Sequence, residues 1–150
     1  MDKEDILTQL NAAKQAHLGW VKRAKSLIEG VPVEQNQIPV ECTACGFGQW
    51  FYSDGQGLKA IPGMDILKVI EEEHSSLHDM YAKIFTIYFT SEELSFLSKL
   101  FGKKKKIPEA DQEMAVEHFA ELQAISVKLL AAIDKLERRI SALPTSSFDR

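Results

Sequence analysis

The amino-acid sequence predicts an all-α fold: an antiparallel four-helix-bundle-like domain with a short extra helix that carries Cys45. Apolar residues recur every three or four positions over long segments, which is the spacing of one buried helix face. No segment shows the strict apolar–polar alternation that is typical of a half-buried strand. Glycine and proline separate the periodic segments and mark the turns between helices.

The first helix is expected from about Lys3 to Glu29. Gly30 and Pro32 follow directly, and both residue types favour the end of a helix. Residues 30–41 lack periodicity and are interpreted as a loop. The buried stripe of this helix consists of residues at spacings of three or four: Ile6, Leu10, Ala13, His17, Val21, Ala24 and Ile28.

A short helix is expected within residues 42–51, where Gly46 and Gly48 allow the backbone to turn tightly. Several turn-forming residues follow this segment, between positions 53 and 63. A second long helix is then expected from position 62 or 65 to about 89. Its buried stripe consists of Leu67, Ile70, His74, Leu77, His78, Tyr81, Phe85 and Tyr88.

Two more helical segments complete the expected bundle. Residues 91–101 (SEELSFLSKLF) form a short one, which Gly102 ends, and the basic run Lys103–Lys106 follows it. The final helix is expected from about Pro108 to Leu143. Its leucines at positions 122, 129, 136 and 143 repeat every seven residues, which is typical of a bundle or coiled-coil seam. We expect part of this seam to remain available for a partner.

Length and composition indicate one soluble globular domain of residues 1–150, with a core of about 3–143 and a C-terminal tail of 144–150. The net charge of −4 gives no reason to expect nucleic-acid binding. The sequence shows neither a membrane-spanning segment nor a signal peptide, so we expect no membrane insertion and a cytoplasmic location. Cysteines in that compartment are more often ligands or redox groups than structural disulfides.

Three histidines and one cysteine form a candidate metal site. His74 and His78 lie four residues apart on a helix, so both can face one ion. His17 lies on the buried stripe of the first helix, and Cys45 lies in the glycine-rich turn. Imidazole and thiolate together favour Zn²⁺, one ion per chain. The alternative for each histidine is an ordinary core residue that is hydrogen-bonded to a backbone carbonyl.

Three other residues are candidates for supporting roles. Trp20 and Trp50 lie close in sequence to the proposed ligands and are expected to exclude water from them, or simply to pack in the core. Cys42 forms a CxxC pair with Cys45, so it is a possible redox partner that captures oxidised Cys45 as a disulfide. It could equally be a buried, inert residue.

The segments HLGW (17–20), CGFGQW (45–50) and HSSLH (74–78), in this order, resemble the chemoreceptor zinc-binding (CZB) domain family. The resemblance implies a helical bundle in which zinc is held by His17, Cys45, His74 and His78. It also implies a homodimer with a sensory role in bacterial chemotaxis or cyclic-di-GMP signalling, with zinc or oxidants such as hypochlorous acid as the input. Members are commonly fused to a chemoreceptor signalling region or a diguanylate cyclase. This chain resembles neither, so we expect a stand-alone member.

The chain is therefore expected to be a zinc-binding regulatory module and not an enzyme. Four protein ligands leave no open position on zinc for a substrate. Two alternatives remain: a zinc-dependent hydrolase or lyase that uses the same ion, and a hemerythrin-like metal-binding bundle. The first requires a metal-bound water and a general base, and the second requires more carboxylates on inward faces.

Overall fold

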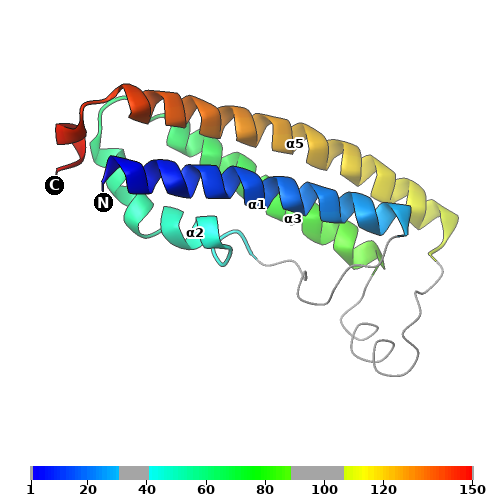
Figure 1. Cartoon of the computed structure of the whole chain (residues 1–150). Helices are drawn as coiled ribbons and strands as arrows, with labels where there is room; N and C mark the ends of the chain where they lie inside the picture. The colour runs from blue at the N-terminus through cyan, green and yellow to red at the C-terminus, as the bar shows by residue number, and fades with distance from the viewer. Residues whose placement is uncertain (1, 31–40, 89–106, 150) are drawn as a thin grey trace.

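Three long helices dominate the computed structural model, which describes residues 2–30, 41–88 and 107–149. They are α1 (Lys3–Glu29), α3 (Ile66–Tyr88) and α5 (Glu109–Ala142), and they lie side by side (Figure 1). The short helix α2 (Gly46–Phe51) and the 3₁₀ helix η2 (Asp54–Ala60) cover one side of this bundle near the start of α1. The predicted all-α class is confirmed. The segment predicted as a helix at 91–101 and the run at 103–106 lie outside the described residues.

The chain direction differs between the long helices. α1 and α3 run the same way along the bundle, and α5 runs in the opposite direction (Figure 1). Polar contacts agree with this arrangement. The Nζ atom of Lys3, at the start of α1, donates to the carbonyl oxygens of Ser141 and Leu143, at the end of α5. α1 and α3 can be parallel because the segment with α2 and η2 brings the chain back before α3 begins.

Local sequence signals account for the helix ends. The Asp2 side chain caps α1 by accepting a hydrogen bond from the backbone N–H of Asp5 at 2.8 Å. Gly30 ends α1 in the left-handed conformation with φ of 80°, which favours glycine. Pro108 precedes α5, and Pro144 follows one residue after its last turn. The boundaries expected for the three long helices therefore agree with the structure to within a few residues.

The heptad leucines of α5 lie in the core of the chain itself. Leu122, Leu129 and Leu136 are at most 1% exposed, and Ile133 and Ile140 are fully buried beside them. α3 and α1 both pack against this face of α5. The expectation that the seam stays available for a partner is wrong for these leucines, because folding of one chain already covers them.

Two smaller expectations also need correction. Near the end of α1 the deeply buried residue is Leu27, while Ile28 is only partly buried, so the buried stripe is displaced by one position. Residues 145–148, expected as a tail, form the 3₁₀ helix η3 (Thr145–Phe148), and Phe148 packs against the core. A single turn of 3₁₀ helix needs few periodic residues, which explains why sequence spacing did not reveal it.

Side-chain contacts fix α5 against its neighbours. The ammonium group of Lys14 on α1 bridges Asp134 and Glu137 of α5 at 2.9 and 2.8 Å. The guanidinium group of Arg139 donates to the Pro62 carbonyl oxygen at 3.0 Å, just before α3 begins. Across the described ranges, no helix combines the length and the apolar character that a bilayer crossing requires.

Candidate metal centre

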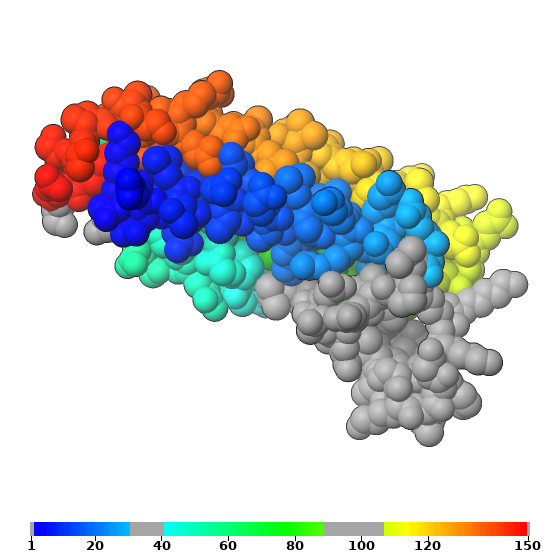
Figure 2. Space-filling view, in the orientation of Figure 1, coloured from blue at the N-terminus to red at the C-terminus, as the bar shows by residue number. Residues whose placement is uncertain are grey.

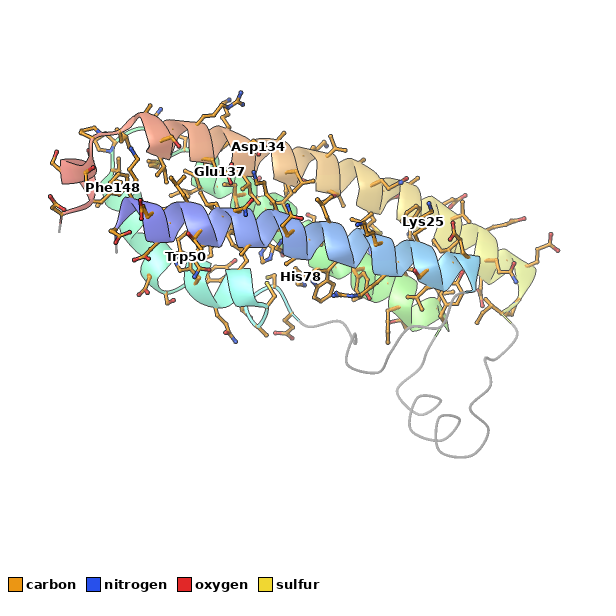
Figure 3. All side chains as sticks on the ribbon, viewed as in Figure 1. Lys25, Trp50, His78, Asp134, Glu137 and Phe148 are labelled. Atoms are coloured by element: carbon orange, nitrogen blue, oxygen red, sulfur yellow. The ribbon has the colours of Figure 1, made fainter. Side chains whose placement is uncertain are left out.

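Four buried side chains from three helical elements meet near the middle of the bundle. His17 lies midway along α1, Cys45 lies directly before α2, and His74 and His78 lie on α3. Each offers one ligand atom, and these atoms all lie within 4.8 Å of one another. None of the four side chains is more than 9% exposed. Figure 3 labels His78, which lies between α1 and α3.

Helix spacing explains how the three imidazoles come together. His74 and His78 are one turn apart on the buried face of α3, and their ring centroids are 4.7 Å apart. α1 passes beside this face, so the His17 ring lies 4.8 Å from that of His74 and 5.7 Å from that of His78. The apolar stripes of the two helices thus carry their histidines to the same level of the bundle.

The turn before α2 places the sulfur. Cys45 is the N-cap of α2, and its Sγ accepts a hydrogen bond from the backbone N–H of Gly48 at 3.2 Å. The same sulfur lies 3.3 Å from Nε2 of His74. A Cβ atom at position 48 would overlap the backbone carbonyl of Cys42, so only glycine fits there. Nothing lies within 4 Å of a Cβ atom at Gly46, so the predicted need for glycine applies to position 48 alone.

Hydrogen bonding orients the His17 ring toward the cluster. Nδ1 lies 2.6 Å from the carbonyl oxygen of Ala13, one turn earlier on α1, and donates its proton to it. This contact fixes the tautomer and leaves the lone pair of Nε2 facing the other three side chains. Nε2 is buried and makes no hydrogen bond, which is costly for a polar atom unless a ligand such as a metal ion satisfies it.

Two of the imidazoles, those of His17 and His74, are held in the neutral form that a metal ligand requires. Burial lowers the pKa of His17 to about 4, although its contact with the Ala13 carbonyl acts in the opposite direction. Burial, and then the nearby His17 and His78, lower the pKa of His74 to about 3. Burial raises the pKa of the Cys45 thiol. A bound divalent cation reverses that effect, because it stabilises the thiolate directly.

The donor set fits one zinc ion. In a tetrahedral zinc site, neighbouring ligand atoms are about 3.3–3.8 Å apart, given the usual Zn–N and Zn–S bond lengths. The 3.3 Å separation of the Cys45 sulfur and the His74 nitrogen matches this range. The widest separation in the cluster, 4.8 Å, exceeds it, so the side chains would move together by roughly one ångström to close on an ion.

Comparison with protein families assigns this region. Residues 17–85 match the model of the chemoreceptor zinc-binding domain. The chain carries a chemoreceptor zinc-binding domain. The matched segment begins at the first histidine of the cluster and includes Cys45, His74 and His78, so this zinc-binding domain contains all four side chains. Comparisons with curated proteins and with solved structures gave no match.

Aromatic rings surround the cluster of the zinc-binding domain. The Trp20 ring packs against His78, with centroids 4.7 Å apart, and against Tyr81 at 4.6 Å. Phe47 packs edge-on against His74 at 4.9 Å and against His17 at 5.9 Å. Trp50, labelled in Figure 3, packs against Phe47, with ring centroids 5.9 Å apart.

Phe47 is the contact that sequence reasoning missed. It is the buried residue of the CGFGQW segment that lies directly against two of the histidines, and it is only 6% exposed. Its position two residues after Cys45 in a short helix was the available signal. Sequence reasoning instead gave the role of water exclusion to the two tryptophans, because each lies close in sequence to a proposed ligand.

Cys42 lies beside the cluster but is not part of it. Its side chain is partly exposed, whereas Cys45 is buried, and neither forms a disulfide. The backbone carbonyl of Cys42 accepts a weak hydrogen bond from the Cys45 thiol at 3.5 Å. Tyr52, whose pKa is raised to about 12 by burial, by Glu71 and by Cys42, lies close to it. Cys42 is therefore not the buried residue of the inert alternative, and its role as a redox partner of Cys45 stays a prediction.

Proposed function

We propose that the chain is a zinc-binding regulatory module in which His17, Cys45, His74 and His78 hold one zinc ion. The observation that carries the proposal is the meeting of these four buried donors within 4.8 Å. They come from α1, the turn before α2, and α3. A shared ion therefore makes the relative positions of three elements depend on metal binding.

Residues around the donors would support the ion. The Ala13 carbonyl holds the His17 ring in the tautomer that presents Nε2. The backbone N–H of Gly48 donates to the Cys45 sulfur, which stabilises negative charge on it. When bound, zinc supplies a positive charge that keeps the thiolate deprotonated and links the helices. Trp20 and Phe47 keep water away from the imidazoles.

The proposed signals act on the bonds between the four donor atoms and zinc. Cys45 provides the only anionic donor among the four, so the sulfur dominates the charge of the site. A two-electron oxidant such as hypochlorous acid converts the thiolate to a sulfenic acid and is itself reduced to chloride, RS⁻ + HOCl → RSOH + Cl⁻. Zinc affinity then falls and α2 is released from α3. Free zinc is the second proposed input, since occupancy itself links the helices.

The proposal assigns binding and not catalysis to the site. Four protein donors fill a tetrahedral zinc ion and leave no position for a substrate or an activated water. Among the described residues, the cluster contains no carboxylate that could act as a bridging ligand. Neither the hydrolase or lyase alternative nor the hemerythrin-like alternative gains support from this donor set.

The proposal extends to location and partners. We place the module in the bacterial cytoplasm, where a buried thiolate stays reduced until an oxidant reaches it. It would act as a homodimer and pass its state to a signalling protein of the chemotaxis or cyclic-di-GMP type. The family match supports this role, since its members are zinc-binding domains of chemoreceptors.

Zinc binding to variants tests the proposal. Competition against a chromophoric chelator should give one tightly bound zinc per wild-type chain. Cys45→Ala and His78→Ala should lose tight binding, whereas Cys42→Ser and His118→Ala, which change residues outside the cluster, should keep it. One equivalent of hypochlorous acid should release zinc from the wild type and from Cys42→Ser. Tight, stoichiometric zinc in Cys45→Ala would overturn the ligand assignment.

A further inference from the structure

The two cysteines of the CxxC pair differ in their access to solvent. Cys45 is 9% exposed and faces the histidines, whereas Cys42 is partly exposed. Glu41, Thr43 and Ala44, which lie next to Cys42 in the chain, are exposed as well, so this turn lies at the surface. The space-filling view shows the segment with α2 on the outside of the bundle, beside α1 (Figure 2). An oxidant that arrives from solvent therefore meets Cys42 before it meets Cys45.

The size of an oxidant decides whether it can reach the Cys45 sulfur. This sulfur lies 3.2 Å from the backbone nitrogen of Gly48 and 3.3 Å from Nε2 of His74, inside the bundle. Hypochlorous acid is little larger than water and needs only a narrow path to it. A disulfide carries a substituent on each sulfur and has to present its S–S bond to the attacking thiolate, so it needs open space around that thiolate. Direct reaction at Cys45 is therefore restricted to small oxidants.

A tight turn keeps Cys42 and Cys45 close together. The backbone N–H of Ala44 donates to the carbonyl oxygen of Glu41 at 2.9 Å, and the Cys45 sulfur lies 3.5 Å from the carbonyl oxygen of Cys42. A carbonyl oxygen is about 2.4 Å from its own Cα atom, so the sulfur is at most about 6 Å from Cα of Cys42. The Cys42 side chain lies close to Tyr52. Rotation of this side chain away from Tyr52, with a small movement of the turn, would bring the two sulfurs within bonding reach.

We propose that Cys42 is the point of entry for disulfide oxidants and that it passes the oxidation to Cys45, which releases zinc. In the first step the Cys42 thiol loses its proton to solvent, attacks a disulfide RSSR, forms a mixed disulfide with one RS group and expels the other as RS⁻. In the second step the Cys45 thiolate attacks the Cys42 sulfur, forms the disulfide between the two cysteines and expels the second RS⁻. The small disulfide is thereby reduced to two thiolates, and the cysteine pair is oxidised by two electrons.

The disulfide removes the anionic donor from the zinc site. A disulfide sulfur carries no charge and binds a divalent cation poorly, so zinc is left with three neutral imidazoles. The bond to Cys42 also draws the Cys45 sulfur away from His74. This inference rests on the zinc site proposed above and adds to its regulation a second class of oxidant. Hypochlorous acid reacts at Cys45 directly, whereas a disulfide reacts through Cys42, and its product is restored by thiol reductants.

An aromatic disulfide, dithiobis(nitrobenzoate), tests the inference on the zinc-loaded full chain. The wild type should release two coloured thiolates per chain, lose zinc to a fluorescent indicator and become lighter by two hydrogen atoms. Cys42→Ser should release zinc at least about tenfold more slowly with this probe, because the buried sulfur is not accessible to it. Hypochlorous acid should still release zinc from Cys42→Ser, which is the control for an intact site. Cys45→Ala should retain one probe fragment on Cys42 as a stable mixed disulfide.

Three outcomes overturn the inference. A wild type that releases no thiolate shows that Cys42 is not an entry point. Equal rates of zinc release in Cys42→Ser and wild type show that the disulfide reaches Cys45 directly. A wild type that keeps its zinc and carries the probe fragment on Cys42 shows that Cys45 does not attack the mixed disulfide. Failure of the proposed function is distinct, because the chain then holds no tight zinc before any oxidant is added, while thiolate release and protein mass still report the transfer between the cysteines.

Discussion

The carbonyl oxygen of Cys42 lies where the side chain of any residue other than glycine at position 48 would have to be. The chain folds back so tightly before α2 that the backbone at 42–43 passes directly over Gly48. This close approach brings the backbone N–H of Gly48 within 3.2 Å of the Cys45 sulfur. The position of the sulfur therefore depends on a glycine three residues further along the chain.

Gly48→Ala should damage the turn and the metal site together. The new methyl group forces the backbone at 42–43 away, at a cost of about 1–3 kcal/mol in stability. It also moves the Cys45 sulfur and weakens zinc binding. Gly46→Ala is the matched control, since Gly46 has open space around its Cβ position and an ordinary backbone conformation. Thermal unfolding and zinc competition check both variants, and equal zinc affinity in the two would contradict this account of the turn.

Removal of zinc should loosen α2 more than α5. α2 has six residues and is held by its aromatic side chains and by Cys45, whereas α5 is fixed by a long leucine and isoleucine face. Amide exchange measured by mass spectrometry should therefore accelerate most strongly in residues 42–52 after chelation. Exchange in the centre of α5 should change little. Uniform acceleration over the whole chain would show that zinc supports global folding without a local effect.

Metal-free protein should lose stability as the pH falls below about 6.5. Unfolding returns His17 and His74 to an ordinary pKa near 6.5, from about 4 and about 3 in the folded state. Between these values the unfolded chain binds more protons, so acid favours unfolding. Each unit of lowered pKa corresponds to about 1.4 kcal/mol. Urea unfolding of chelator-treated protein measures this slope, and it should become shallower in His74→Leu, which carries no titrating ring. An unchanged slope would contradict burial of a neutral His74.

Phe47→Ala should weaken zinc binding although Phe47 offers no ligand atom. Its ring covers His17 and His74, and its removal opens a cavity and admits water to both imidazoles. Stability should fall by about 3–5 kcal/mol, as is usual for deletion of a buried phenylalanine. Phe47→Leu retains most of the apolar volume and should lose less affinity. Calorimetric zinc titration compares the two variants, and equal affinities in Phe47→Ala and wild type would show that the ring is not needed around the site.

Sequence spacing predicted much of this molecule because helices encode their buried face locally. The stripes on α1 and α3 placed His17, His74 and His78 on inward faces before any packing was known. The turn with Cys45 was expected beside them because of its neighbouring glycines and the family resemblance. The structure brings the four side chains together, which the spacing of residues on separate helices cannot itself establish.

The features that sequence spacing did not predict depend on contacts between distant parts of the chain. The heptad leucines of α5 looked equally suitable for a partner and for the core, and only the packing of α1 and α3 shows that they are internal. Gly46 and Gly48 looked alike in sequence, yet only the second meets another backbone. The parallel course of α1 and α3 follows from the path of the returning segment, which periodicity does not describe.

X-ray absorption at the zinc edge tests the central claim most directly, because it counts the atoms bonded to the ion in solution. Full-length protein with one equivalent of zinc should show one sulfur at about 2.3 Å and three nitrogens at about 2.0–2.1 Å, with imidazole scattering from each nitrogen. Cys45→Ala, which should bind zinc only weakly, should show no sulfur at this distance when it is measured with excess zinc. A wild-type spectrum without sulfur, or with oxygen in place of an imidazole, would contradict the proposed ligand set.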